Sequence, residues 1–165
     1  MDHRSQWPAR GRTATVTAAP PGRCVRRVVS GSVSIERINP GELAQPSGFS
    51  HAVTATGGRL VFLAGQTALD HDGSITGSSV AEQFERALGN LLAALNAAGG
   101  VPGDLASLTV YVLDVDDYRA HSQEIGEVWR GLVGRDYPAM AVIGVQRLWD
   151  LRALVEVQGI AMVTP

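Results

Sequence analysis

The amino-acid sequence predicts an α+β fold in which two helices cover one face of a mixed β-sheet. Two segments, residues 79–100 and 116–134, carry apolar residues at helical spacing. Segments typical of strands precede the first helix, separate the two helices and follow the second. Two helices can cover only one side of such a sheet. We therefore expect copies of the same chain to cover the other side in a closed ring.

Three strands are expected before the first helix, within residues 34–40, 49–55 and 57–69. The first ends at a proline, and Gly57-Gly58 provides a turn before the third. In the third segment, RLVFLAG is apolar at both alternating positions. This pattern predicts a central strand that is covered on both faces.

The first helix has clear signals at both ends. Ser79 and Glu82 form a capping-box pattern at its start. Gly99-Gly100 follows its last apolar residue, and glycine is typical of a helix C-terminus. The signals predict a helix that begins just after Ser79 and ends before Gly99.

The second half of the chain predicts a strand within 105–115, one amphipathic helix at 116–134, and two final strands within 141–148 and 152–163. The expected buried side of this helix carries Tyr118, Ile125, Val128, Trp129 and Leu132. A loop around Trp149 joins the final strands.

The last strand has two different faces. One face is uniformly apolar and carries Val155, Val157, Gly159, Ala161 and Val163. The opposite face mixes apolar and polar groups and carries Leu154, Glu156, Gln158, Ile160 and Met162. We expect the first face to pack on the helices and the second to meet a partner subunit.

The composition divides the chain into a leader, residues 1–34, and one domain, residues 35–165. The 165 residues are 45% hydrophobic, enough for a single core. The leader contains several Pro and Gly residues and no sustained periodicity, which predicts weak order or disorder. It contains six arginines, and the chain has no lysine, which is typical of a GC-rich bacterial coding sequence.

Charge and residue spacing exclude several classes of function. The net charge is −2, and with an Arg-rich leader the domain itself is acidic, which argues against nucleic acid as a partner. No apolar run approaches the ~18 residues of a membrane span. The single cysteine, Cys24, fits a cytoplasmic location. The four histidines are scattered, so we expect no metal site.

Several strings resemble one family in unbroken order over about residues 35–163. They are GFSHAV, LVFLAGQTALDHDG, ERALGNLLAALNAAG, LTVYVLDVDDY, YPAMAV and LVEVQGIA. They are similar to the Rid/YjgF family, the reactive intermediate deaminases, also described as L-PSP endoribonucleases. The resemblance implies a chorismate-mutase-like α+β fold and a homotrimer with clefts between subunits. It also implies hydrolysis of enamines and imines in those clefts without a metal or cofactor.

The resemblance also implies site residues. Gly65 in AGQ matches the segment that lines the family's cleft, and Phe49 stands where the deaminases usually have tyrosine. Tyr118 and Ser122 match positions near the neighbouring subunit's cleft. Glu156 matches the acidic residue that positions or activates the attacking water.

Met140 departs from the family pattern. It stands in Pro-Ala-Met, where the family has Pro-Ala-Arg and the arginine grips the substrate carboxylate. A thioether cannot replace a guanidinium, which binds a carboxylate through two charge-assisted hydrogen bonds. We therefore expect a neutral or more hydrophobic substrate in a cleft with Glu156 as the acid or base.

Two other functions stay open from the sequence alone. The chain can be a trimeric ligand-binding or scaffold protein in which Met140 packs in the core and Glu156 is an interface carboxylate. The other is ribonuclease activity or RNA binding, for which the Arg-rich leader is the only supporting feature of the sequence. The sequence also leaves open whether another cation, such as Arg147 or Arg152, takes the place of the family's arginine.

Overall fold

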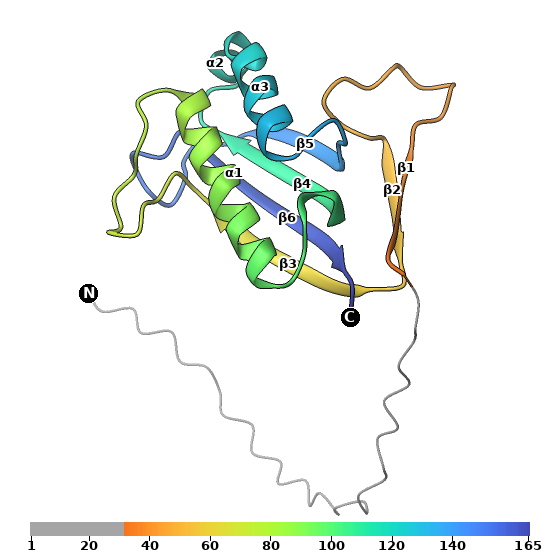
Figure 1. Ribbon diagram of the computed structural model, residues 1–165. Helices are drawn as coiled ribbons and strands as arrows, with labels where there is room; N and C mark the ends of the chain where they lie inside the picture. The colour runs from red at the N-terminus through yellow and green to blue at the C-terminus, as the bar shows by residue number, and fades with distance from the viewer. Residues whose placement is uncertain (1–31) are drawn as a thin grey trace, which may run out of the picture.

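The computed structural model describes residues 32–165 and forms one layer of helices on one layer of sheet (Figure 1). The predicted α+β fold is thereby confirmed. Of the predicted leader, residues 1–31 lie outside the described part of the chain. The main sheet has the strand order β3-β6-β4-β5, and β1 and β2 form a separate hairpin beside it. The sheet is mixed, because β4 and β5 run parallel while β6 is antiparallel to both of its neighbours.

The elements follow the predicted order. The strands are β1 (Ser34–Ile38), β2 (Ala52–Thr56), β3 (Arg59–Gln66), β4 (Leu105–Val112), β5 (Ala139–Gly144) and β6 (Val155–Val163). The helices are α1 (Val80–Ala97), the short 3-10 helix η1 (Pro102–Asp104), α2 (Val115–Ala120) and α3 (Ser122–Leu132). None of these helices is long and apolar enough to cross a membrane.

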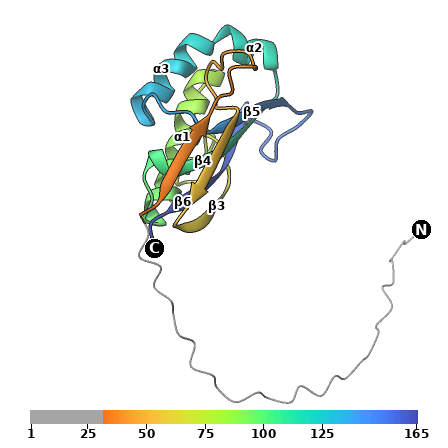
Figure 2. The same ribbon diagram turned by 90° about the vertical axis from the view of Figure 1, so that its right-hand side faces the viewer.

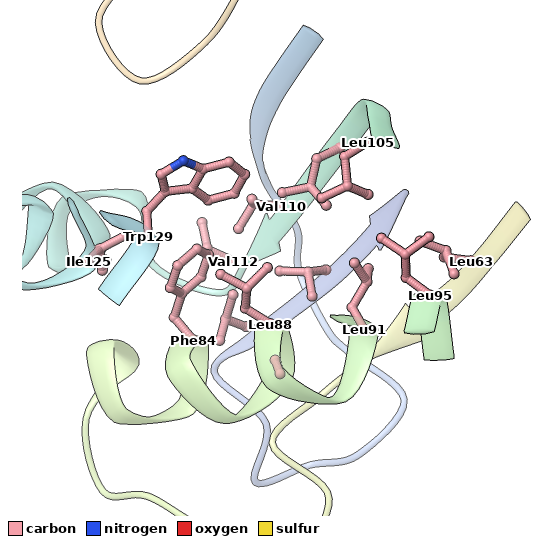
Figure 3. Close-up of a cluster of buried hydrophobic side chains, with 14 of the residues drawn as sticks. Leu63, Phe84, Leu88, Leu91, Leu95, Leu105, Val110, Val112, Ile125 and Trp129 are labelled. Carbon is pink, nitrogen blue, oxygen red and sulfur yellow. The ribbon is translucent and has the colours of Figure 1, made fainter. Parts of the chain in front are cut away.

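Helix α1 supplies the centre of the core. The predicted capping box at Ser79 and Glu82 is present, because each side chain bonds the other residue's backbone N–H. One side of the helix is fully buried against the sheet, with Phe84, Leu88 and Leu91 pointing at β4 and β6 (Figure 3). A leucine buried in this way contributes about 2 kcal/mol through removal of apolar surface from water.

The second predicted helix is broken into α2 and α3 at His121. The expectation of two helices was therefore wrong in number, although all of them lie on the same side of the sheet (Figure 2). Asp114 caps α2 by accepting hydrogen bonds from two backbone N–H groups. The predicted buried residues Ile125 and Trp129 are in the core, whereas Leu132 is exposed. The apolar spacing runs through His121, so it did not reveal the break.

The prediction that β3 is a central strand was also wrong. It is an edge strand of the four-stranded sheet, and Leu60 and Phe62 are 54% and 75% exposed on the side without helices. Apolar residues at both alternating positions indicate that both faces are to be covered. Among residues 32–165 only the helix side is covered, so Leu60 and Phe62 leave an apolar surface on the other side.

The β1-β2 hairpin is attached to the turn that precedes β5. The buried Ser50 donates its hydroxyl to the carbonyl of Tyr137 at 2.6 Å, and its N–H bonds the carbonyl of Pro138 at 2.9 Å. Arg37 donates to the same Tyr137 carbonyl at 3.2 Å. These bonds hold Phe49, the residue before Ser50, beside the start of β5.

Candidate functional site

A pocket of about 520 Å³ lies on the helix side of the sheet. Its size is that of a small-molecule site. Four of the six residues that the sequence singled out line it: Phe49, Tyr118, Ser122 and Met140. They come from the segment after β1, from α2, from α3 and from β5. The structure thus brings together residues that are up to 91 positions apart in the chain (140 minus 49).

Tyr118 and Ser122 were expected one turn apart on one helix, but they lie on α2 and α3, on either side of the break. Burial raises the pKa of the Tyr118 hydroxyl to about 12, so this group stays a neutral donor at ordinary pH. At the break, the hydrogen bond between the His121 ring and the Asp117 carbonyl raises the pKa of His121. Tyr118 also packs its ring edge-on against Phe84, with 6.2 Å between ring centroids.

Phe49, Met140 and Ala141 line both this pocket and a smaller one of about 310 Å³, and so form the boundary between them. Met140 lies opposite Leu108 of β4 and packs against the core, as its register requires. The smaller pocket also includes Ser107 and Thr109, which alternate with Leu108 and point to the helix-free face. The residues shared by the two pockets therefore lie between the helix side of the sheet and its other face.

Glu156 and Gly65 lie together on the helix-free face, away from the larger pocket. Glu156 pairs with Tyr111 in the sheet, and its neighbours Val155 and Val157 are fully buried on the helix side. A Cβ built on Gly65 would lie 2.8 Å from the carboxyl carbon of Glu156. Only glycine leaves room for the carboxyl there.

Within one chain, Glu156, the expected acid or base, is separated from Met140 both along the strands and by the sheet itself. The register places Glu156 in the row of Tyr111 and places Met140 in the row of Leu108. Three residues along a strand correspond to about 10 Å, and the two side chains also leave opposite faces of the sheet. The single chain does not bring Glu156 into the pocket of Met140.

The backbone around Glu156 is held from both sides. Register changes between Leu63 and Gln66 release Gly65 from regular pairing with β6, and such irregularities frequently occur beside active sites. The buried Gln83 of α1 bonds the carbonyl of Arg152 at 3.1 Å and accepts from the N–H of Leu154 at 2.8 Å. The start of β6 is therefore fixed just before Glu156.

Several pocket residues were not predicted as functional. Trp129 stacks on Tyr137 with ring centroids 5.1 Å apart, and both line the larger pocket. The sequence assigned Trp129 to the core, and helical spacing alone does not distinguish a core wall from a pocket wall. Arg130 also lines the pocket, although the sequence drew attention only to Arg147 and Arg152 as alternative cations.

No group of three or more His, Cys, Asp or Glu side chains that could hold a metal ion is found in residues 32–165. His51, a possible base by its position, has its ring within hydrogen-bond distance of the Ala44 carbonyl at 2.8 Å. Its backbone N–H bonds the side chain of Asn39 at 2.9 Å. These contacts give His51 a structural role in the segment that carries Phe49.

Comparison with protein families gives one match over most of the described chain. The model of the endoribonuclease L-PSP family matches residues 41–163. That range contains both the larger pocket's four predicted residues and the Glu156–Gly65 pair.

Individual relatives agree with this match. A RutC family protein, UK114, of Drosophila melanogaster is 30% identical over 139 residues, covering 84% of this chain and 90% of its own. A goat (Capra hircus) protein named 2-iminobutanoate/2-iminopropanoate deaminase is 28% identical over 142 residues, covering 86% and 93%. The crystal structure of a protein of unknown function of the conserved Rid family from Yersinia pestis is 33% identical and superposes with a TM-score of 0.70, covering 78% of this chain and 98% of its own.

Proposed function

Because the chain belongs to the endoribonuclease L-PSP family, also called the Rid/YjgF family, we propose that it hydrolyses imines or enamines, or a related reactive carbonyl compound. The reaction takes place in a cleft between subunits of a homotrimer. The deaminase name of the goat relative supports the reaction type. The substrate is neutral or hydrophobic, since Met140 offers no cation to a carboxylate on the reacting carbon.

The observation that carries this proposal is the placement of Glu156 against Gly65 on the helix-free face. The carboxyl occupies the space that a side chain at position 65 would take, and therefore lies directly against the backbone of β3. Beside this pair the same face exposes Phe62 and Ile143, an apolar surface suited to a second copy of the chain. The second copy is the occupant we propose.

A neighbouring subunit would complete the site. The smaller pocket lies next to Met140 and Phe49 and reaches the helix-free face of the sheet. A copy that docks on this face can present its Glu156 there, which one chain cannot do alone. Each cleft would then combine the larger pocket of one subunit with the Glu156–Gly65 pair of the next.

The proposed chemistry requires one water molecule and no other reactant. Glu156 takes a proton from the water as its oxygen bonds to the imine carbon, and gives this proton to the imine nitrogen to form a carbinolamine. It then takes the proton of the carbinolamine hydroxyl and gives it to the same nitrogen, so that the carbon–nitrogen bond breaks, ammonia leaves and the oxygen becomes the carbonyl oxygen. The product is the corresponding carbonyl compound. The Gly65 backbone, released from the regular sheet ladder, helps to hold the reacting group.

A comparison of two substrates tests this proposal. We expect the wild-type protein to accelerate ammonia release from an aromatic imine without a carboxylate, generated in the assay from benzylamine by an amine oxidase. We expect little acceleration with freshly generated 2-aminoacrylate. Met140→Arg should raise the rate with 2-aminoacrylate by about 10-fold or more, because an arginine fork can bind its carboxylate.

Met140→Leu is the matched control, since it keeps the pocket apolar and should leave both rates close to the wild-type values. Rapid hydrolysis of 2-aminoacrylate by the wild-type protein would show that Met140 does not exclude a carboxylate. Failure to accelerate either reaction would count against hydrolysis and favour a ligand-binding protein.

A further inference from the structure

We propose that Arg130 is the anion-binding group of the larger pocket, and that the ligand carries a carboxylate remote from an aromatic or branched apolar body. The inference rests on the proposed function, because the same pocket would hold the substrate. The substrate would then be amphipathic, with an apolar body and one carboxylate. The cation that binds this carboxylate would lie on α3 and not at the position of Met140 on β5, where the family has its arginine.

The position of Arg130 over Gly126 is the first observation. The Nη1 atom of Arg130 lies 3.4 Å from the place that a Cβ on Gly126 would occupy. The two residues are four positions apart and thus share one side of α3. The guanidinium therefore lies back along the helix beside Gly126, at the pocket wall.

The second observation is the charge of the pocket. Arg130 is the only charged residue among those that line it, and no ion pair joins it to another residue in the range 32–165. Other helix arginines are paired: Arg86 contacts Asp70 and Arg119 contacts Asp116. A guanidinium that no carboxylate neutralises attracts an anion.

The remaining walls indicate what else the ligand contains. Phe49, Tyr137 and Met140 line the pocket and are partly exposed, so they present aromatic and thioether surface that suits a flat or branched apolar group. Tyr118 and Ser122 contribute neutral hydroxyls. The pocket of about 520 Å³ is much larger than a three-carbon acid requires. A longer ligand can fill the apolar part while its carboxylate pairs with Arg130.

Binding of 4-phenylbutyrate, whose carboxylate is separated from the ring by three methylene groups, and of its uncharged methyl ester, measured by isothermal titration calorimetry, tests the inference. Wild-type protein should bind the acid more tightly than the ester. Arg130→Gln should weaken binding of the acid by about 10-fold or more and leave the ester unaffected, because hydrogen bonds to charged groups are the stronger ones. Arg130→Lys should retain part of the difference.

Arg119→Gln is the control, since Arg119 pairs with Asp116 at 3.7 Å and does not line the pocket. Equal affinity of acid and ester for the wild type, no binding of the acid, or an unchanged affinity in Arg130→Gln would overturn the inference. The measurement needs no turnover, so its result is independent of whether the protein hydrolyses imines. Conversely, normal binding without ammonia release would reject only the proposed hydrolysis.

Discussion

Replacing Glu156 by Gln is expected to lower the rate of imine hydrolysis by about 10²- to 10⁴-fold, the usual contribution of a general acid–base group. The amide keeps the size of the carboxyl but neither accepts nor returns a proton at neutral pH. Its contact with Gly65 is retained. The turnover number should therefore fall, while the mass of the assembly and the unfolding midpoint stay the same.

This result separates the enzyme from the scaffold protein that the sequence left open. Light scattering and chemical denaturation of the same sample show whether the carboxylate serves assembly. If Glu156→Gln dissociates the oligomer or destabilises the fold and turnover is unaffected in the remaining assembled protein, Glu156 is an interface residue. Glu85→Gln, on the exposed side of α1, is the control for loss of a negative charge.

Replacing Gly65 by Ala is expected to lower turnover by about 10²-fold, because a misplacement of about 1 Å in a catalytic group has effects of this size. The new methyl group would meet the Glu156 carboxyl and force it aside. The three atoms nearest to the added carbon all belong to Glu156, so we expect this side chain to move and stability to change little.

Kinetics and thermal unfolding of Gly65→Ala check this prediction. Gly89→Ala is the matched control, since Gly89 has open space around a built Cβ and lies in α1. A Gly65→Ala protein with wild-type turnover would show that the position of the Glu156 carboxyl does not matter for the reaction. A strongly destabilised protein with normal turnover per folded chain would give the glycine a purely structural role.

Local signals predicted the elements of the fold well. The caps and apolar spacing of α1 are properties of adjacent residues, and the alternation in β6 correctly predicted the face that packs on the helices. The position of β3 at the sheet edge was not predictable in this way. Apolar residues on both faces of a strand indicate that both faces are covered, but they do not show whether the same chain or another copy covers them. The break at His121 was hidden because both halves of the helix share one apolar side.

The candidate site was predictable as a set of residues but not as an arrangement. Phe49, Tyr118 and Met140 line one pocket. Strand register then places Glu156 on the opposite face, a relation that appears only once the strands are paired. Arg130 was missed because only the packing of α3 beside β5 shows that it lines the same pocket as Met140.

Mixing two inactive variants tests most directly whether the site is shared between subunits. Glu156→Gln keeps the larger pocket and loses the acid. Gly126→Trp keeps the acid, and its side chain fills the pocket wall where only the Arg130 guanidinium is near. The two proteins are unfolded together and refolded as mixed oligomers, and imine hydrolysis is compared with that of each variant refolded alone.

If each cleft takes its pocket from one copy and Glu156 from the next, random assembly should restore about a quarter of the wild-type clefts, because each requires an intact half from two chains. Activity in the mixture well above the sum of the separate variants is the predicted result. A mixture of confirmed mixed oligomers that stays as inactive as its components would contradict a shared site.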